Sequence, residues 1–287
     1  MKRFFKGAIA MAATAVIATS AISPAMAKDA DPSNNEPNRG RYAAVGDSFA
    51  AGVGNPTLKH AGASLRSSAA YPVVLAGADN KVNFLAESGA TVADTMVQVG
   101  SLTPSVRQVT ITVGGNDLGF ANVILACFEG LDTTACQGAL TNAKAASAML
   151  PERLTTLLGE VHQTAPNAHV YVTGYPVLFQ AGSYCATYPT ANPLLLAQLD
   201  QYASNLNDVI ESVVSGAIHQ GDPAITYVDV EGKFENMGMC NPQGYIFPPV
   251  NLQTGQPNPY PVHPNVGGQR AYAEAIADAG FTTSAMG

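Results

Sequence analysis

Tryptophan is absent from the sequence, and positively charged residues are few. Only 12% of the 287 residues are charged, and 21 acidic residues against 14 Lys and Arg give a net charge of −7. Nucleic acid and anionic lipid both attract Lys and Arg, because these side chains neutralise phosphate groups. The composition therefore argues against a nucleic-acid partner and against electrostatic docking on anionic membranes.

A membrane-spanning run is also missing. The chain opens with Lys2, Arg3 and Lys6, continues as an Ala-rich apolar run over 7–17, and reaches an Ala-Met-Ala sequence that ends at Ala27. This pattern is typical of a secretory signal peptide, and the run is shorter than the about 20 residues that span a membrane. We therefore expect residues 1–27 to be a signal peptide, cleaved on secretion to the extracellular space, and no stable membrane insertion.

The part that follows the expected cleavage site resembles one globular domain after a short leader. Cleavage would remove three cations and no acidic residue, which leaves 260 residues with a net charge of −10. Residues 28–40 are polar and contain two prolines, so we expect a flexible leader there. Residues 41–287 show no internal repeat and are numerous enough to bury a core as one α/β domain.

Four cysteines, Cys127, Cys136, Cys185 and Cys240, lie in this domain. None of them forms a C-x-x-C pair, which argues against a metal site. In an exported chain an even number indicates disulfides, and four cysteines allow three pairings. We favour Cys127–Cys136, which closes a short loop, together with Cys185–Cys240; four buried free thiols are the alternative.

Apolar runs alternate with helical patterns along the domain. The predicted strands cover 42–45, 82–85, 106–113, 169–173 and 225–230. The predicted helices cover about 137–163 and 266–279, and a third has an apolar stripe at spacings of three and four residues from Leu195 to Val213. This alternation predicts a mostly parallel sheet with helices on both faces, whose ligand sites lie beyond the carboxyl ends of the strands.

Residues suited to catalysis follow three of these strands and precede the last helix. Ser48 follows the first strand in Gly-Asp-Ser, Gly89 the second in Ser-Gly-Ala-Thr, and Asn116 the third after two glycines, while His263 precedes the helix at 266. A serine can be a nucleophile, a histidine its base, and an amide can donate to an oxyanion. Alone, the glycine-containing motifs are more typical of ordinary turns, and a lone histidine is more often structural or exposed. All four in this order favour a catalytic site.

With their flanking residues, these motifs resemble the GDSL/SGNH hydrolase family, in its secreted actinobacterial lipase and esterase branch. The Ser, Gly, Asn and His of the family's name match Ser48, Gly89, Asn116 and His263. Further matching segments are 42–52, 71–72, 88–91, 115–120, 174–176, 263–265 and 268–269, so the resemblance covers roughly residues 40–280.

The resemblance implies a three-layer α/β/α fold around a mostly parallel five-stranded sheet, and chemistry without a cofactor or metal. Ser48 is then expected to attack the ester carbonyl while His263 accepts its proton. The backbone N–H groups of Ser48 and Gly89 and the Asn116 amide would form the oxyanion hole. The expected substrate is a small-molecule or lipid ester, bound by a chain that we expect to be monomeric.

Two features depart from the family pattern. Many members have an Asp three residues before the histidine, where Tyr260 stands here, so we expect the Tyr260 main-chain carbonyl to orient His263 in a Ser–His dyad. Relatives often have three disulfides, and Glu87 occupies a position where one of those has Cys. The two bridges favoured above match the rest of the family pattern.

Several other functions remain open. A carbohydrate O-deacetylase or a phospholipase could use the same scaffold, although sugar sites often use Trp platforms and this chain has no Trp. A binding protein on an inactive hydrolase scaffold would be marked by loss of Ser48, Asn116 or His263, and all three are present. A structural or adhesive protein would need repeats or a surface-anchor tail, and we recognise neither.

Overall fold

The computed structural model describes residues 41–77, 81–127, 133–180, 185, 192–251 and 254–282. The expected signal peptide, 1–27, and leader, 28–40, lie outside the described residues.

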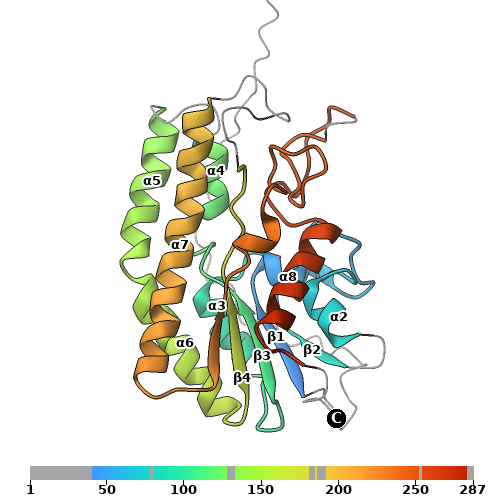
Figure 1. Cartoon of the computed structure of the whole chain (residues 1–287), viewed down its shortest axis with the longest axis vertical. Coiled ribbons are helices and arrows are strands. Elements are labelled where there is room, and N and C mark those ends of the chain that lie inside the picture. Colours follow the sequence, from blue (N-terminus) through green and yellow to red (C-terminus); the bar gives the residue numbers. More distant parts are fainter. Residues whose placement is uncertain are drawn as a thin grey trace, which may run out of the picture. The chain divides into compact units, whose positions relative to one another are not determined.

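Five strands form one sheet in the order β2-β1-β3-β4-β5, and every neighbouring pair is parallel (Figure 1). They are β1 (Tyr42–Gly46), β2 (Val82–Phe84), β3 (Gln108–Thr112), β4 (His169–Thr173) and β5 (Ile225–Val228). β1 and β3 are buried along their whole length, as strands covered on both faces must be. The predicted parallel sheet is confirmed, and each of its five strands lies where an apolar run predicted one.

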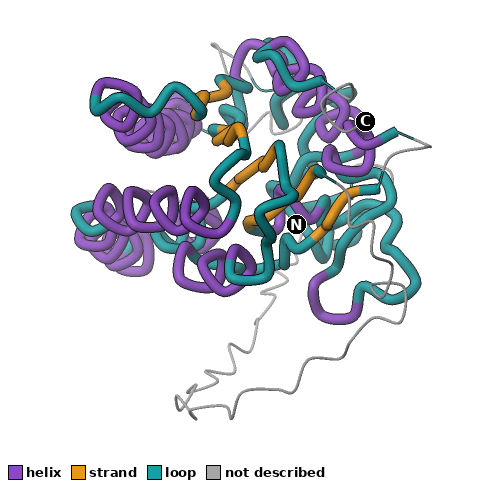
Figure 2. Tube along the Cα trace, turned by 90° about the horizontal axis from the view of Figure 1, so that it is seen from below, coloured by secondary structure: helices purple, strands orange, loops and turns teal. Residues whose placement is uncertain are grey.

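Helices cover the sheet on both sides. They are α1 (Ser48–Ala51), α2 (Tyr71–Ala76), α3 (Val92–Val99), α4 (Phe120–Cys127), α5 (Thr134–Ser147), α6 (Leu150–Thr164), α7 (Pro193–His219) and α8 (Val266–Asp278), with short 3₁₀ turns η2 (Gly62–Ser64) and η3 (Glu231–Phe234). Helix α3 packs on α6 and α6 on α7, whereas α2 packs on α8. Figure 2 shows helices on both sides of the strands. Right-handed crossovers place these two groups on opposite faces, which gives the expected three-layer α/β/α fold.

The helix predicted over 137–163 is in fact two helices. α5 ends at Ser147 and α6 begins at Leu150, with Pro151 in its first turn. Proline removes a backbone donor and clashes with the preceding turn, so it is accepted at a helix start and not in the interior. The apolar periodicity continues across this break, which is why the pattern alone predicted one helix.

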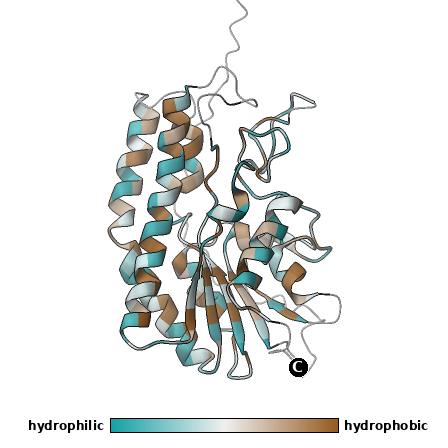
Figure 3. Ribbon diagram, in the orientation of Figure 1, coloured by the Kyte–Doolittle hydropathy of each residue, from teal (hydrophilic) through white to brown (hydrophobic). Residues whose placement is uncertain are grey.

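The other two helix predictions are confirmed by α7 and α8. α7 buries the Leu195, Leu199 and Leu206 side of its stripe, and Figure 3 shows polar and apolar residues alternating along it. No helix within the described ranges combines the length and the apolar character needed to cross a membrane.

Both favoured disulfides are present. Cys127 at the end of α4 bonds to Cys136 in the first turn of α5, and Cys185 bonds to Cys240 in the loop between η3 and α8. The first bridge closes a loop over a sequence separation of 9 residues and the second over 55. The alternative of free thiols is excluded for these four residues.

Candidate active site

The strand order itself indicates where a site should lie. The chain leaves β1 toward β2 on one side, and β3 returns on the other side of β1. In open parallel sheets ligands bind at such a switch point, beyond the carboxyl ends of the strands. Ser48 follows β1 and Asn116 follows β3, so two of the predicted site residues lie there.

Ser48 is presented by a tight turn between β1 and α1. Gly46 has φ +126°, and a Cβ at this position would lie 2.1 Å from the Thr112 carbonyl oxygen of β3, so only glycine fits. Asp47 then caps α1, because its Oδ1 accepts a 2.9 Å hydrogen bond from the Phe49 N–H. Gln98 of α3 holds Gly46 through both its N–H (2.7 Å) and its carbonyl (3.0 Å).

His263 reaches Ser48 from the other end of the domain. Its Nε2 lies 2.8 Å from Ser48 Oγ, and its Nδ1 lies 2.8 Å from the Pro261 carbonyl oxygen. A carbonyl can only accept a hydrogen bond, so Nδ1 carries the ring proton in the neutral imidazole. Nε2 is then the acceptor for the Ser48 hydroxyl. This is the tautomer that general-base catalysis requires.

The expectation that Tyr260 supplies the orienting carbonyl is corrected by one residue. The hydrogen-bonded carbonyl belongs to Pro261, and the Tyr260 carbonyl makes the smaller of two backbone contributions that raise the His263 pKa. Val262, between Pro261 and His263, has a left-handed backbone with φ +61°. A β-branched residue rarely adopts this conformation.

Burial shifts the ionisation of two groups in the site. It lowers the pKa of His263 below its usual 6.5, opposed by hydrogen bonds to the two backbone carbonyls. A neutral imidazole is therefore available at neutral pH. Burial also raises the pKa of Asp47 from 3.8 to about 7, opposed chiefly by the hydrogen bond from the Tyr175 hydroxyl.

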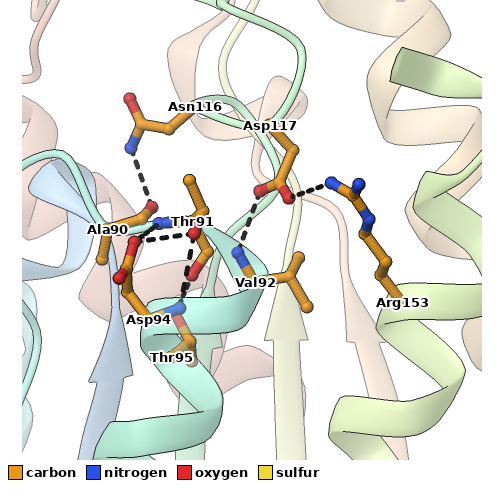
Figure 4. Close-up of polar contacts among 8 residues, drawn as sticks. All are labelled: Ala90, Thr91, Val92, Asp94, Thr95, Asn116, Asp117 and Arg153. Carbon is orange, nitrogen blue, oxygen red and sulfur yellow. Dashed lines mark hydrogen bonds and ion pairs between the residues drawn. The ribbon is translucent and has the colours of Figure 1, made fainter. Parts of the chain in front are cut away.

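The expected oxyanion donors are placed unequally. Among the described residues no acceptor bonds to the N–H of Ser48 or of Gly89. Gly89 has φ +80°, and no heavy atom beyond its chain neighbours lies within 4 Å of where a Cβ would stand. The Asn116 amide donates to the Ala90 carbonyl at 2.9 Å (Figure 4), and its second N–H is the one left for a ligand.

The turn after β3 is bound to the start of α3 by a second contact. Asp117 accepts a 2.9 Å hydrogen bond from the Val92 N–H and lies 3.2 Å from the Arg153 guanidinium of α6 (Figure 4). Its side chain is 2% exposed. Asn116 and Asp117 therefore join the turn that carries Asn116 to the turn that carries Gly89.

Sequence reasoning gave no role to several residues that support this site. Tyr175 belongs to a segment that matched the family, but nothing in the sequence shows that its hydroxyl bonds to Asp47. Gln98 and Gln269 are buried glutamines whose side chains bond to Gly46 and Phe49. A buried polar residue on an otherwise apolar helix face is the signal that could have indicated them.

Two surface hollows lie away from all these residues. One of about 620 Å³ opens between α2 and α8 beside Arg270 and Glu274. Another of about 430 Å³ lies between α6 and α7 beside His162. Neither hollow is lined by Ser48, His263 or the expected oxyanion donors. The candidate site is therefore identified by the chemistry of its side chains and not by the size of a hollow. No three described His, Cys, Asp or Glu side chains gather as metal ligands.

Comparison with known proteins identifies the family. The model of the GDSL-like lipase/acylhydrolase family matches residues 44–271. Lipase 1 of Streptomyces coelicolor is 29% identical over 79% of this chain and 82% of its own length. The lipase of Streptomyces rimosus is 30% identical over 70% of this chain and 73% of its own length.

Two solved structures share the fold. The phospholipase A1 of Streptomyces albidoflavus NA297 superposes with a TM-score of 0.72 at 30% identity, covering 84% of this chain and 99% of that one. The extracellular lipase of Streptomyces rimosus superposes with a TM-score of 0.70 at 28% identity, covering 83% and 98%. The chain belongs to the GDSL-like lipase/acylhydrolase family and is a carboxylic ester hydrolase.

Proposed function

We propose that Ser48 is the nucleophile and His263 the general base of this hydrolase. The supporting observation is the 2.8 Å contact from Ser48 Oγ to a His263 Nε2 whose tautomer is set by the Pro261 carbonyl. His263 takes the hydroxyl proton as Ser48 Oγ bonds to the ester carbonyl carbon. The proton then passes to the leaving alcohol, and the acyl-enzyme remains. In the second half, His263 takes a proton from water as the water oxygen bonds to the acyl carbon. The bond from this carbon to Ser48 Oγ then breaks, the acid leaves, and His263 returns the proton to Oγ.

The negative oxygen of each tetrahedral intermediate is held by Ser48, Gly89 and Asn116. The backbone N–H groups of the first two have no acceptor among the described residues, which leaves them available. They also stand at fixed turns, and fixed donors stabilise developing charge without reorganising. Asn116 adds one side-chain N–H while the other anchors it to Ala90.

The base acts in a dyad and not in a triad. The acceptor at Nδ1 is the neutral Pro261 carbonyl, which orients the ring but stabilises an imidazolium less than a carboxylate does. Asp117, an acidic residue near the oxyanion donors, already binds Val92 and Arg153.

The substrate is an ester with an acyl chain, in a lipid or simple ester. Support comes from the relatives, whose names are lipase and phospholipase A1, and from the lack of the Trp platforms that sugar sites often use. A phospholipase is the second candidate because of the structural neighbour of that name. Rates on p-nitrophenyl acyl esters of varied chain length, on phospholipid vesicles and on acetylated sugars separate these from a deacetylase, which would prefer the acetylated sugars.

The protein acts outside the cell, after removal of residues 1–27, as a monomer with leader 28–40 and catalytic domain 41–287. Two disulfides and a relative described as an extracellular lipase support export. The intact mass of protein collected from the culture medium tests this: a chain beginning at Lys28 is expected, and a mass that includes residue 1 contradicts it. Light scattering tests the monomer.

The nucleophile is tested by Ser48→Ala and by a serine-reactive phosphonate. The phosphonate should modify Ser48 of the native protein and no other residue. Ser48→Ala should lose ester hydrolysis by about 10⁴-fold or more, with an unchanged circular dichroism spectrum. Near-native hydrolysis by this variant, or a phosphonate adduct elsewhere, contradicts the assignment.

A further inference from the structure

One buried hydroxyl joins the turn that carries Ser48 to the turn that carries Asn116. Tyr175 follows β4, and its hydroxyl donates to Asp47 Oδ2 at 2.5 Å. The same oxygen accepts a 3.0 Å hydrogen bond from the Gly115 N–H. Asp47 and Tyr175 are each 1% exposed, so water cannot take the place of either partner.

Each end of this bridge adjoins a residue of the proposed mechanism. Asp47 precedes Ser48 and caps the helix that Ser48 begins. Gly115 precedes Asn116 and lies close under the Tyr175 ring, since a Cβ on Gly115 would stand 3.3 Å from the hydroxyl oxygen. A change in the bridge therefore changes the separation between the nucleophile and an oxyanion donor.

The tyrosine itself is held firmly. Asn207 of α7 accepts from the Tyr175 N–H and donates to the Tyr175 carbonyl, both at 2.7 Å. The ring packs edge-on against Phe49 at 4.9 Å between centroids and stacks with Phe120 at 6.1 Å. Phe49 in turn contacts the His263 ring at 5.3 Å. The hydroxyl thus has one position relative to the sheet.

We propose that Tyr175 is a positioning residue for ester hydrolysis, whose hydroxyl fixes the nucleophile turn and the oxyanion turn relative to each other. The inference rests on the proposed roles of Ser48 and Asn116. It assigns Tyr175 no contact with the substrate: the tyrosine acts through Asp47 and Gly115. Errors of about 1 Å in such a geometry can lower turnover by about 10²-fold.

The ionisation of Asp47 gives this role a measurable signature. An ionised carboxylate accepts from both Phe49 and Tyr175, whereas a proton on Oδ2 would leave the Tyr175 hydroxyl hydrogen without its acceptor. The other titratable groups that interact with Asp47 are Asp117 after β3, Tyr71 on α2 and Tyr272 on α8. Since the Asp47 pKa is about 7 and that of His263 is below 6.5, loss of the bridge on protonation of Asp47 is expected to set the acidic limb of the kcat–pH profile.

The test is Tyr175→Phe in the full chain, with kcat and KM measured against pH on a p-nitrophenyl ester. We expect kcat to fall about 10- to 100-fold with KM nearly unchanged. In the native protein the hydrogen bond from Tyr175 lowers the Asp47 pKa. Its loss should raise that pKa and move the acidic limb to higher pH. Turnover is expressed per site titrated by the phosphonate, which removes any unfolded fraction from the comparison.

Two further variants separate positioning from loss of stability. Tyr42→Phe removes an equally buried hydroxyl, bonded to Thr110 in the sheet, and should keep kcat and the pH profile while costing similar stability. Asp47→Asn should lower kcat and move the acidic limb below pH 6.5, to the His263 titration. Adding Tyr175→Phe to Asp47→Asn should then cost much less than Tyr175→Phe alone.

Native kcat per titrated site in Tyr175→Phe, an unmoved acidic limb, or a full additional loss in the double variant overturns the inference. These results are distinct from failure of the proposed function. If the phosphonate does not modify Ser48 of the native protein, the nucleophile assignment fails. If it does modify Ser48 and Tyr175→Phe behaves as Tyr42→Phe does, only the role of Tyr175 fails.

Discussion

The two halves of the candidate site are held in different ways. Ser48 and Asn116 stand two and four residues beyond the ends of β1 and β3, and buried side chains of α3 and of the segment after β4 bind their turns. His263 stands in the loop between η3 and α8, whose described residues form isolated bridges, such as Ile246 with Pro264, and no strand. The sheet thus fixes Ser48 and Asn116, the proposed nucleophile and a proposed oxyanion donor, whereas His263, the proposed base, depends on a loop.

The loop compensates with contacts back to the nucleophile side. Asn55, shortly after α1, donates from its side chain to the Pro264 carbonyl at 2.9 Å. The His263 carbonyl accepts from Phe247 at 2.8 Å, and Cys240 joins the same loop to Cys185. One site thus combines turns fixed by the sheet, which carry Ser48 and Asn116, with a loop that a few individual bonds hold in place.

The largest effect is expected where the halves meet. His263→Ala removes the ring that lies 2.8 Å from Ser48 Oγ, so kcat should fall by about 10⁴-fold or more while the fold is kept. Steady-state hydrolysis measures kcat, and a thermal melt shows whether the variant is folded. A variant that folds and retains a tenth of native turnover would show that another group serves as base.

A smaller loss is expected on the oxyanion side. Asn116→Ala removes one donor to the developing charge, which typically costs about 10²–10³ in turnover. It also leaves the Ala90 carbonyl without its partner, so the melting temperature should fall slightly. The matched control is Asn55→Ala, which removes a buried amide from the loop side. It should change KM and stability more than it changes kcat. Equal kcat losses in both variants would contradict a special role for Asn116.

Breaking the two disulfides should affect the halves unequally. Replacing Cys185 and Cys240 by Ser is expected to cost about 2–4 kcal/mol, and more than replacing Cys127 and Cys136, because the bridge closes a longer loop. Activity should be lost at lower denaturant concentration in the first variant, since its bridge holds the His263 loop. Denaturation curves followed by activity and by circular dichroism test this; the opposite order contradicts it.

The buried Asp47 should make stability fall as pH rises. Its folded pKa of about 7 exceeds the ordinary value of 3.8, so the native state binds the proton more tightly than the unfolded state does. Its stabilising contribution is therefore complete below about pH 4 and is lost as pH rises through 7. From pH 5 to pH 8 the unfolding free energy of the native chain should therefore fall relative to that of Asp47→Asn. A constant difference would show that Asp47 ionises normally.

The smallest effect is expected at Tyr260, whose side chain lies on the loop surface. Its ring is 36% exposed, and the carbonyl that bonds His263 belongs to Pro261. Tyr260→Ala should thus keep activity within a few-fold. Tyr260→Asp should raise the His263 pKa and move that titration upward if the new carboxylate reaches the ring. A loss of turnover in Tyr260→Ala as large as in His263→Ala would show that the side chain itself is essential.

The fold and the site differ in how much of them the sequence predicts. Continuous apolar runs predict the five strands, because parallel strands are buried on both faces. Motifs at strand ends indicate Ser48, Gly89, Asn116 and His263, since parallel strands bring their carboxyl ends to one edge. The apolar periodicity predicted one helix across Pro151, where the structure has two.

Other features depend on tertiary placement and leave little trace in the sequence. Val262 has a left-handed backbone and the Pro261 carbonyl bonds to the His263 ring, and no residue preference in the sequence indicates either feature. The Tyr175 bridge joins residues 128 positions apart in the chain, so only the folded arrangement reveals it.

The central claim is that His263 works with a main-chain carbonyl and without a partner carboxylate. The most direct measurement is kcat for variants in which each Asp and Glu of residues 41–282 is changed singly to Asn or Gln, with folding followed for each. The account predicts that none loses about 10⁴ in turnover, the cost of removing a triad acid, and that Asp47→Asn shows the moderate loss of a positioning group. One folded variant with a loss of about 10⁴ would contradict the dyad.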